Sequence, residues 1–318
     1  MDHIGPEKLA VLSEDESEQI VELINHIQPA SPWSMKHLRW QFFETPAGRA
    51  RLYGIRDSKN KLVAFYAAVA QRVWLGNRLV PARMIQDVMT HPDYRGRGFL
   101  HDLAEHCCQD IVQSGEVGYT FPNEKSEKSF RRTGWTELCS VPWRQKSLHP
   151  ALTSKPKLEV TQISGGFDDV ASSIWSSSDL AVGVNRDAAY LNWRYGKPAT
   201  TYFKFLVNSH EGLIVLKLYQ DGGQSTLHLC ELITRNDASE NVGEMLKFCQ
   251  RFGTQNGAGI FTAWLSESHP YSHAFNQFGL EPVSRGSRYV FVHPGQGSAG
   301  EVANPKLWHL SQGDSDIY

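Results

Sequence analysis

The residues best suited to chemistry lie between positions 87 and 100. Two glycines, Gly96 and Gly98, alternate with Arg95 and Arg97, directly before an apolar helical pattern that begins at Phe99. Glycine lets the backbone turn so that successive N–H groups face one space, and a helix N-terminus adds partial positive charge. The segment therefore predicts a cradle of backbone donors for a pyrophosphate, with two guanidinium groups beside it.

Two common phosphate-binding motifs do not fit this loop. It does not end in Lys-Ser or Lys-Thr, as a Walker loop does. It also lacks the three-glycine fingerprint of dinucleotide-binding folds.

The elements around the cradle are those of a mixed α/β domain. Apolar periodicity and turn residues predict helices over 13–27, 35–43, 99–113 and 126–133, and strands over 51–56, 61–71, 73–89 (two strands) and 117–121. Ser13 and Glu16 have the spacing of a capping box, and Gly134 is placed to end the last helix.

This arrangement resembles the GCN5-related N-acetyltransferase (GNAT) superfamily. Its motif A reads Arg/Gln-x-x-Gly-x-Gly/Ala, which Arg95 and Gly98 match, although Leu100 stands at the last position. Residues 121–126 read Phe-Pro-Asn-x-x-Ser, which resembles a motif of one subgroup of the family.

The resemblance implies that acetyl-CoA is the acetyl donor. Backbone N–H groups of residues 97–100 would hold the pyrophosphate, and the strand through Val88 and Thr90 would pair with the pantetheine arm. A backbone N–H of that strand would polarise the thioester carbonyl. The cofactor-binding residues expected from it are Val88, Thr90, Arg95, Gly96, Arg97, Gly98, Phe99, Leu100, Asn123 and Ser126. Asn123 has a helix cap as its alternative role.

The catalytic residues are less well defined. Many family members carry a tyrosine four residues before the glycine matched by Gly134, and its hydroxyl protonates the leaving thiolate; here that position is Phe130. Asp87, Tyr119 and Ser126 are the candidates to replace it, each with a structural role as the alternative. No general base is assigned within the first half.

The second half of the chain repeats the first. The Leu-x-Trp-x-Phe pattern around Trp40 resembles a Leu-x-Trp-x-Tyr pattern around Trp193, and strands over 212–219 and 259–265 and a helix over 273–278 follow in the same order. We therefore expect an α/β protein of the GNAT fold, a mixed central sheet flanked by helices, duplicated as two GNAT-like halves. Residues 235–240, where a second cradle would lie, hold no glycine but carry Asp237 and Glu240, so this half is predicted not to bind CoA.

Proline spacing suggests the domain limits. They are a GNAT domain with the acetyl-CoA site over 1–145, a linker over 146–156, a degenerate GNAT-like domain over 157–293 and a tail over 294–318. Residues 307–310 form an apolar anchor, and we expect the tail to dock at the seam between the halves, where Asp314 or Asp316 would hold or deprotonate the amine.

Composition limits the remaining possibilities. The 318 residues carry a net charge of −2, which argues against a general nucleic-acid binder. The longest apolar run is nine residues, too short for a membrane span, and the first ten residues do not read as a secretory signal. Five cysteines without metal-site spacing predict reduced thiols, a cytoplasmic location and no metal site.

The predicted function is an acetyl-CoA-dependent N-acetyltransferase acting on a primary amine. An amino sugar or nucleotide-linked amino sugar of a polysaccharide pathway is the preferred acceptor. Aminoglycosides, polyamines and protein lysines are alternatives, as is a non-catalytic acyl-CoA-binding regulator. The chain is expected to be a monomer or homodimer.

Overall fold

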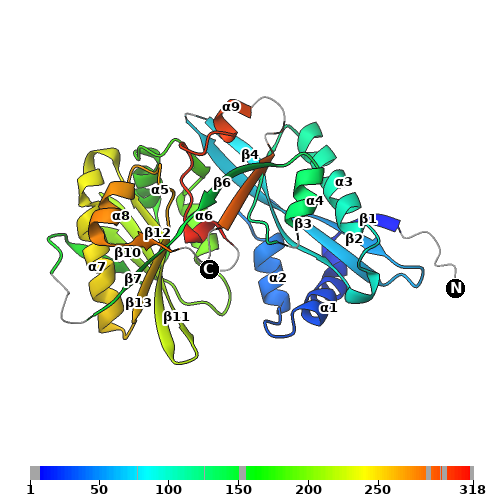
Figure 1. Ribbon diagram of the computed structural model, residues 1–318, viewed down its shortest axis with the longest axis horizontal. Coiled ribbons are helices and arrows are strands. Elements are labelled where there is room, and N and C mark those ends of the chain that lie inside the picture. Colours follow the sequence, from blue (N-terminus) through cyan, green and yellow to red (C-terminus); the bar gives the residue numbers. More distant parts are fainter. Residues whose placement is uncertain are drawn as a thin grey trace. The chain divides into compact units, whose positions relative to one another are not determined.

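The computed structural model describes residues 8–76, 78–124, 126–149, 155–283, 288–293, 295 and 299–315. These residues divide into two compact units (Figure 1). The first comprises residues up to Val73, Leu79–Cys139 and Tyr289–Ala303. The second comprises Trp74–Arg78, Ser140–Arg288 and the residues from Asn304 onward.

The first sheet has the strand order β1-β2-β3-β4-β5-β15-β6. Its β1, β2 and β3 are antiparallel neighbours, whereas β4 and β5 run parallel. The strands are β1 (Lys8–Leu12), β2 (Arg51–Arg56), β3 (Leu62–Leu75), β4 (Arg78–Thr90), β5 (Val117–Thr120), β6 (Thr136–Val141) and β15 (Arg288–His293).

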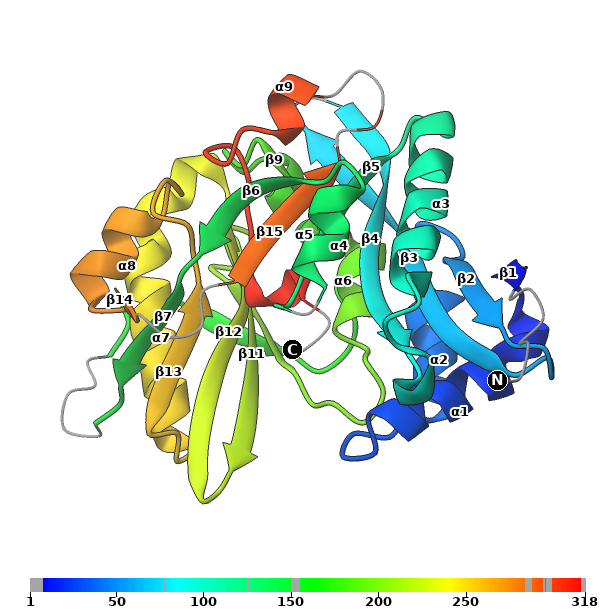
Figure 2. The ribbon, with the colours of Figure 1, turned by 45° about the vertical axis from the view of Figure 1, so that its right-hand side comes forward.

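Helices cover both faces of this sheet. Phe65 on β3 packs on Phe42 of α2, and its neighbour Tyr66 points the other way, toward Phe130 of α4. Figures 1 and 2 show α1 and α2 on one side of the strands and α3 and α4 on the other. The helices are η1 (Glu14–Glu16), α1 (Ser17–Ile27), α2 (Met35–Phe42), η2 (Pro92–Tyr94), α3 (Phe99–Gln113), α4 (Glu127–Arg132) and α9 (Ala299–Val302). The capping box of Ser13 and Glu16 is confirmed.

The second sheet has the order β14-β7-β13-β12-β11-β10-β8, again with one parallel pair, β12 and β13. Helices α7 and α8 pack together and α7 lies against β11–β13, while α5 lies against β11 and β12. Its strands are β7 (Trp143–Ser147), β8 (Val160–Ile163), β10 (Phe203–Val207), β11 (Gly212–Asp221), β12 (Gln224–Thr234), β13 (Ile260–Trp264) and β14 (Glu281–Pro282). Its helices are α5 (Asp169–Ser176), α6 (Ala188–Arg194), η4 (Asn236–Asn241), α7 (Val242–Gln255), α8 (Ser272–Phe278) and η5 (Gln312–Asp314). The short strand β9 (Val182–Val184) pairs with β3 of the first sheet.

The units divide the chain differently from the proline-based limits. Strand β7, which spans the expected boundary at 145–146, pairs with β13 in the second sheet. Strand β15, expected in the second domain, pairs with β5 in the first sheet. Prolines mark where a strand or helix stops, but they carry no information about which sheet the next strand joins.

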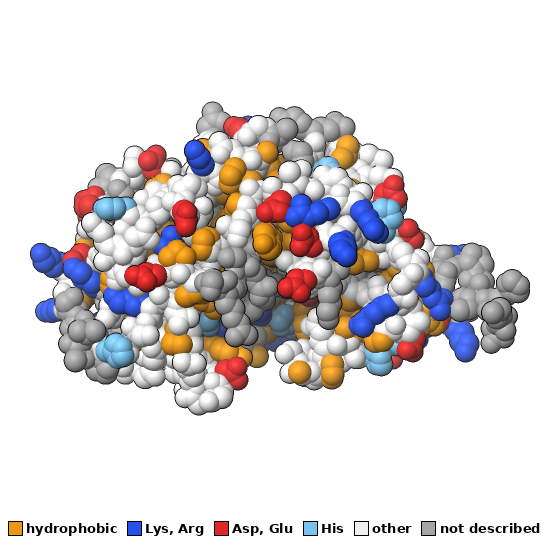
Figure 3. All heavy atoms as spheres, viewed as in Figure 1, with side chains coloured by type: hydrophobic (Ala, Val, Ile, Leu, Met, Phe, Trp, Pro, Cys, Tyr) orange, Lys and Arg blue, Asp and Glu red, His pale blue; other side chains and the backbone are white. Residues whose placement is uncertain are grey.

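No helix in the described part of the chain is long and apolar enough to cross a membrane. None of the five cysteines, all of which are described, forms a disulfide. On the face shown in Figure 3, Lys and Arg side chains are interspersed with Asp and Glu, in keeping with the small net charge.

Candidate active site

The candidate site begins where two parallel strands separate. Strands β4 and β5 pair from Ala82 to Ile85, opposite Val117 to Thr120, and the pairing stops there. The hydroxyl of Thr120 donates a hydrogen bond to the Ile85 carbonyl at 2.9 Å, at the last pair of residues that joins the two strands. Two residues further on, Asp87 takes a left-handed conformation (φ 53°) that redirects β4. The strand ends therefore diverge, which leaves backbone groups of β4 without a strand partner on the β5 side.

The cradle follows β4. Gly96 (φ 80°) and Gly98 (φ 87°) both adopt the left-handed conformation that favours glycine, and no atom lies within 4 Å of a Cβ built on either. Helix α3 begins directly after Gly98, whose carbonyl accepts the His101 N–H at 2.8 Å. The N–H groups of Phe99 and Leu100 precede the first intrahelical hydrogen bond, so they are available to an anion.

A single cavity of about 660 Å³ connects the cradle with the separated strand. All ten residues expected to bind the cofactor line it: Val88, Thr90, Arg95, Gly96, Arg97, Gly98, Phe99, Leu100, Asn123 and Ser126. Helix α4 and the end of α1 complete its walls with Ile27, Gln28, Ser129 and Arg132.

The charge of this cavity suits a polyanion. Arg95, Arg97 and Arg132 line it, and no Asp or Glu is among its described lining residues. The Arg95 Nε donates to the Thr90 carbonyl at 3.3 Å, and the Arg97 guanidinium lies 4.9 Å from the Tyr94 ring. Tyr94 in turn donates its hydroxyl to Asp57 at 2.6 Å, which anchors the loop to the β2–β3 turn.

Asn123 and Ser126 form the turn that starts α4. The Asn123 side-chain oxygen accepts the Ser126 N–H at 3.1 Å, and the Ser126 hydroxyl accepts the Asn123 N–H at 3.2 Å. The two residues thus fix the turn before α4 and also line the cavity, whereas the Ser126 side chain at the N-cap makes no capping hydrogen bond to the helix.

The three expected catalytic residues are placed differently. Asp87 is half-buried at the kink of β4, next to the lining residue Val88 but not itself in the wall. Tyr119 is not among the described residues that line the cavity, and its ring is buried beside Phe121. Asp316 lies outside the described residues. Phe130 is buried against Trp135 (ring centroids 5.3 Å apart) and offers no hydroxyl.

Residues 10–137, which hold this whole site, match the family described as acetyltransferase (GNAT) domain. This part of the chain is therefore similar to GNAT acetyltransferase domains. Comparison with curated proteins gives no match.

Solved structures share the GNAT fold over nearly the whole chain. A probable N-acyltransferase of Enterococcus faecalis aligns with a TM-score of 0.69 at 12% identity, over 95% of this chain and 74% of its own. A GCN5-related N-acetyltransferase of Anabaena variabilis gives 0.68 at 14%, over 94% and 73%. The Saccharomyces cerevisiae N-myristoyltransferase with bound myristoyl-CoA gives 0.60 at 10%, over 92% and 83%. These likenesses establish the fold of the two halves.

The cavity of the GNAT domain fits the acyl-CoA that such domains bind. Glycines leave room at the cradle, arginines supply positive charge, and α4 offers a further polar group. That group is Ser129, whose hydroxyl oxygen is buried and has no hydrogen-bond partner among the described residues.

Sequence reasoning missed Ser129 and Arg132. Both follow Ser126 on α4 at three-residue steps, so all three side chains lie on one face of the helix. That spacing is the signal that could have identified them.

In the second half, the described residues after β12 form no glycine cradle, as predicted. Residues Asn236–Asn241 form the 3-10 helix η4, and α7 starts after Asn241 with φ −74° instead of after a left-handed glycine. A smaller cavity of about 350 Å³ lies there, and its charged lining residues in the described chain are Asp179 and Glu240, with His273 beside them. Asp237 has no described side chain.

Proposed function

We propose that the first unit transfers an acetyl group from acetyl-CoA to a primary amine. The observation that carries this proposal is the meeting, in one cavity, of the glycine cradle, the arginines and the stretch of β4 that has left β5. Bound there, acetyl-CoA supplies its acetyl group as a thioester, which the amine attacks to give an amide and a free thiol.

Residues of this chain take three tasks in the proposal. The N–H groups of residues 97–100 hold the pyrophosphate, and Arg95 and Arg97 screen its charge. Backbone groups of Val88 and Thr90 bind the pantetheine amides as an added strand would. An N–H group just after Asp87 donates to the thioester carbonyl oxygen, where negative charge develops.

Proton transfer is the least constrained step. Because Phe130 cannot donate a proton, the thiolate must receive one from another group or from water. We propose Asp87, which is fixed at the kink beside Val88. Tyr119, whose ring is buried, and Asp316 are the alternative proton donors.

The preferred acceptor is an amino sugar or nucleotide-linked amino sugar, on the resemblance to two-half proteins of polysaccharide pathways. The chain's unpaired cysteines are compatible with a reducing, cytoplasmic setting. A monomer or homodimer is proposed as the working form, which light scattering can check.

The test combines binding with turnover. Gly98→Asp places a carboxylate at the cradle and strains a left-handed position, so acetyl-CoA affinity measured by calorimetry should fall roughly 100-fold or more. Gly223→Asp is the matched control, because Gly223 has nearly the same φ (84°) and equally open surroundings but lies in the second unit.

Thiol release from acetyl-CoA with a panel of amino sugars, aminoglycosides, polyamines and lysine peptides then identifies the acceptor. Unchanged affinity in folded Gly98→Asp would overturn the site. Tight binding with no thiol release from any amine would favour the non-catalytic regulator.

A further inference from the structure

The second unit contains a counterpart of the acyl-CoA groove. Its parallel pair β12 and β13 stops at His228 and Thr262, as β4 and β5 stop at Ile85 and Thr120. Two residues beyond His228, Cys230 is the extra residue of a bulge, because Val215 pairs with Glu231 and Leu216 with Leu229. In the first unit, Asp87 likewise follows Ile85 by two residues.

By this register Glu231 corresponds to Val88, a lining residue of the acyl-CoA cavity. The two grooves thus share backbone geometry but present a carboxylate in one and an apolar side chain in the other.

The C-terminal segment fills this second groove. The Gly313 backbone lies so close to the β12 bulge that a Cβ there would overlap the Tyr195 hydroxyl and lie 2.8 Å from the Cys230 carbonyl oxygen. Gln312 donates to the Thr262 hydroxyl at 3.3 Å, at the point where β12 and β13 separate. Upstream, His309 N–H donates to the Val182 carbonyl at 2.7 Å, and Trp308 is only 2% exposed. The apolar anchor therefore packs on the second unit, and docking at the seam between the halves stays a prediction.

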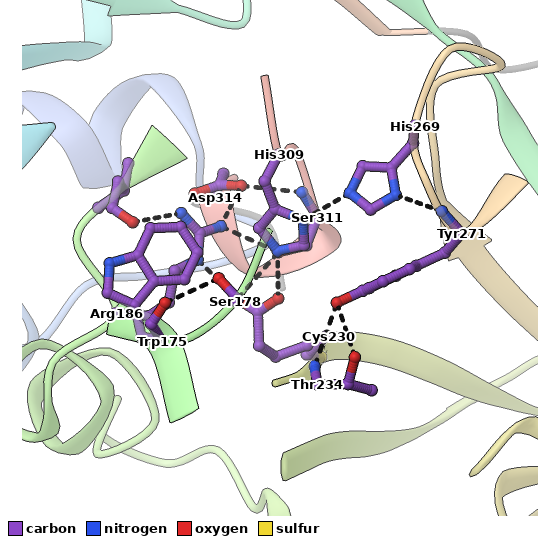
Figure 4. A network of polar contacts seen from close by, with 12 residues as sticks. Trp175, Ser178, Arg186, Cys230, Thr234, His269, Tyr271, His309, Ser311 and Asp314 are labelled. Atoms are coloured by element: carbon purple, nitrogen blue, oxygen red, sulfur yellow. Dashed lines mark hydrogen bonds and ion pairs between the residues drawn. The ribbon is translucent and has the colours of Figure 1, made fainter. Parts of the chain in front are cut away.

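Four buried charges hold the segment in place. Arg186 donates to Glu231 at 3.1 Å and to Asp314 at 2.7 Å (Figure 4). Arg194 donates to the carbonyls of Gly313 at 2.6 Å and Ser315 at 2.7 Å. The two guanidinium groups balance the two carboxylates, which removes the cost of burying an unpaired charge.

This arrangement also corrects the expected role of Asp314. It is 3% exposed and its carboxylate is bound to Arg186 and to the Ser311 N–H at 2.8 Å, so it cannot hold a substrate amine.

A chain of hydrogen bonds fixes His309 of the segment and its neighbour His269. Tyr271 N–H donates to His269 Nδ1 at 3.1 Å, so neutral His269 carries its proton on Nε2. That proton faces His309 Nδ1 at 2.9 Å, which leaves the His309 proton on Nε2, 2.9 Å from Glu231 (Figure 4). Each donor in this chain of hydrogen bonds meets an acceptor.

We infer that the β12–β13 groove of the second unit is a peptide-binding site whose ligand is the chain's own segment Leu307–Ser315. The segment takes the place that acyl-CoA occupies in the proposed first-unit site. Glycine at 313, the His309–Glu231 pair and the Arg186–Asp314 pair are its recognition elements. The inference does not depend on catalysis, because every contact lies within the second unit.

Hydrogen exchange of the full chain tests this inference. In the wild type, amides of residues 308–315 should exchange at least ~100-fold more slowly than in a synthetic peptide of residues 304–318. Gly313→Ala should raise their exchange about ten-fold or more, while amides of β12 and β13 keep their protection. Gly300→Ala is the control, since no atom lies within 4 Å of a Cβ built there.

Asp314→Asn serves as a milder variant if Gly313→Ala does not fold, and the same local rise in exchange is expected. Added wild-type 304–318 peptide should bind the variant whose own segment is released, and should not bind the wild type. The inference is overturned if wild-type tail amides exchange at the peptide rate, or if the variants leave tail exchange unchanged. Loss of protection in β12 and β13 to the same extent would also overturn it, because the segment would then be an inseparable part of the core.

Discussion

The two halves carry the same pair of diverging parallel strands but use the gap between them in opposite ways. In the first half, two left-handed glycines and three arginines surround an open cavity of about 660 Å³. In the second, η4 replaces the glycine loop and Glu231 stands where the first half has Val88. A duplicated backbone can therefore keep its groove while a few side chains decide whether the groove takes a pyrophosphate or a peptide.

The arginines give the sharpest contrast between the halves. Arg186→Met leaves Glu231 and Asp314 as uncompensated buried charges, so the free energy of unfolding should fall by about 3–5 kcal/mol. Arg97→Met, in the open cavity, should change stability by less than about 0.5 kcal/mol but weaken acetyl-CoA binding roughly ten-fold. Urea titration and calorimetry measure both quantities. Equal losses of stability in the two variants would contradict a structural role for Arg186 and a binding role for Arg97.

The strand kinks offer a second contrast. Asp87→Asn keeps a residue type that tolerates the left-handed conformation but removes the acid, so turnover should fall roughly 100-fold with acetyl-CoA affinity preserved. Cys230, the bulge residue of β12, is fully buried, which raises its pKa to about 12. Cys230→Ala should leave the kcat of folded protein unchanged. A pH profile of kcat that Asp87→Asn does not alter would refute the acid role.

Acidification should lower the stability of the second unit. Burial holds the pKa of His269 well below 6.5, so the unfolded chain takes up a proton below that pH and the folded chain does not. Despite burial, which acts in the opposite direction, Arg186 and His309 lower the pKa of Glu231 to about 2, so its contribution is present above pH 4.5 and is lost as the pH falls toward 2.

Both effects lower the stability of the second unit on acidification, by about 1.4 kcal/mol per pH unit for each proton taken up. The protection factors of the tail amides, which are exchange rates corrected for the intrinsic pH dependence of amide exchange, should fall from pH 7.5 to 5.0 in the wild type and fall less in His269→Gln. A flat profile in the wild type would contradict this linkage.

The sequence was informative where the signal is local. The Gly96 and Gly98 cradle, the capping box at Ser13 and the left-handed Gly134 each depend on residues within a few positions, and all three appear in the structure. The face of α4 that carries Ser129 was equally readable from its spacing.

The remainder depends on contacts between distant segments. Arg186, Glu231 and Asp314 come from three parts of the chain up to 128 residues apart, and no pattern around any one of them indicates its partners. Strands β7 and β15 join sheets other than those expected from the domain limits for the same reason. Strand pairing is set by the whole fold and not by neighbouring residues.

The number of acetyl-CoA molecules bound per chain is the most direct test of the account. Isothermal titration of the wild type should give one site per chain, and Gly98→Asp should lose that site while Gly223→Asp retains it. Two sites in the wild type, or one site that survives Gly98→Asp, would contradict the assignment of donor binding to the first half alone.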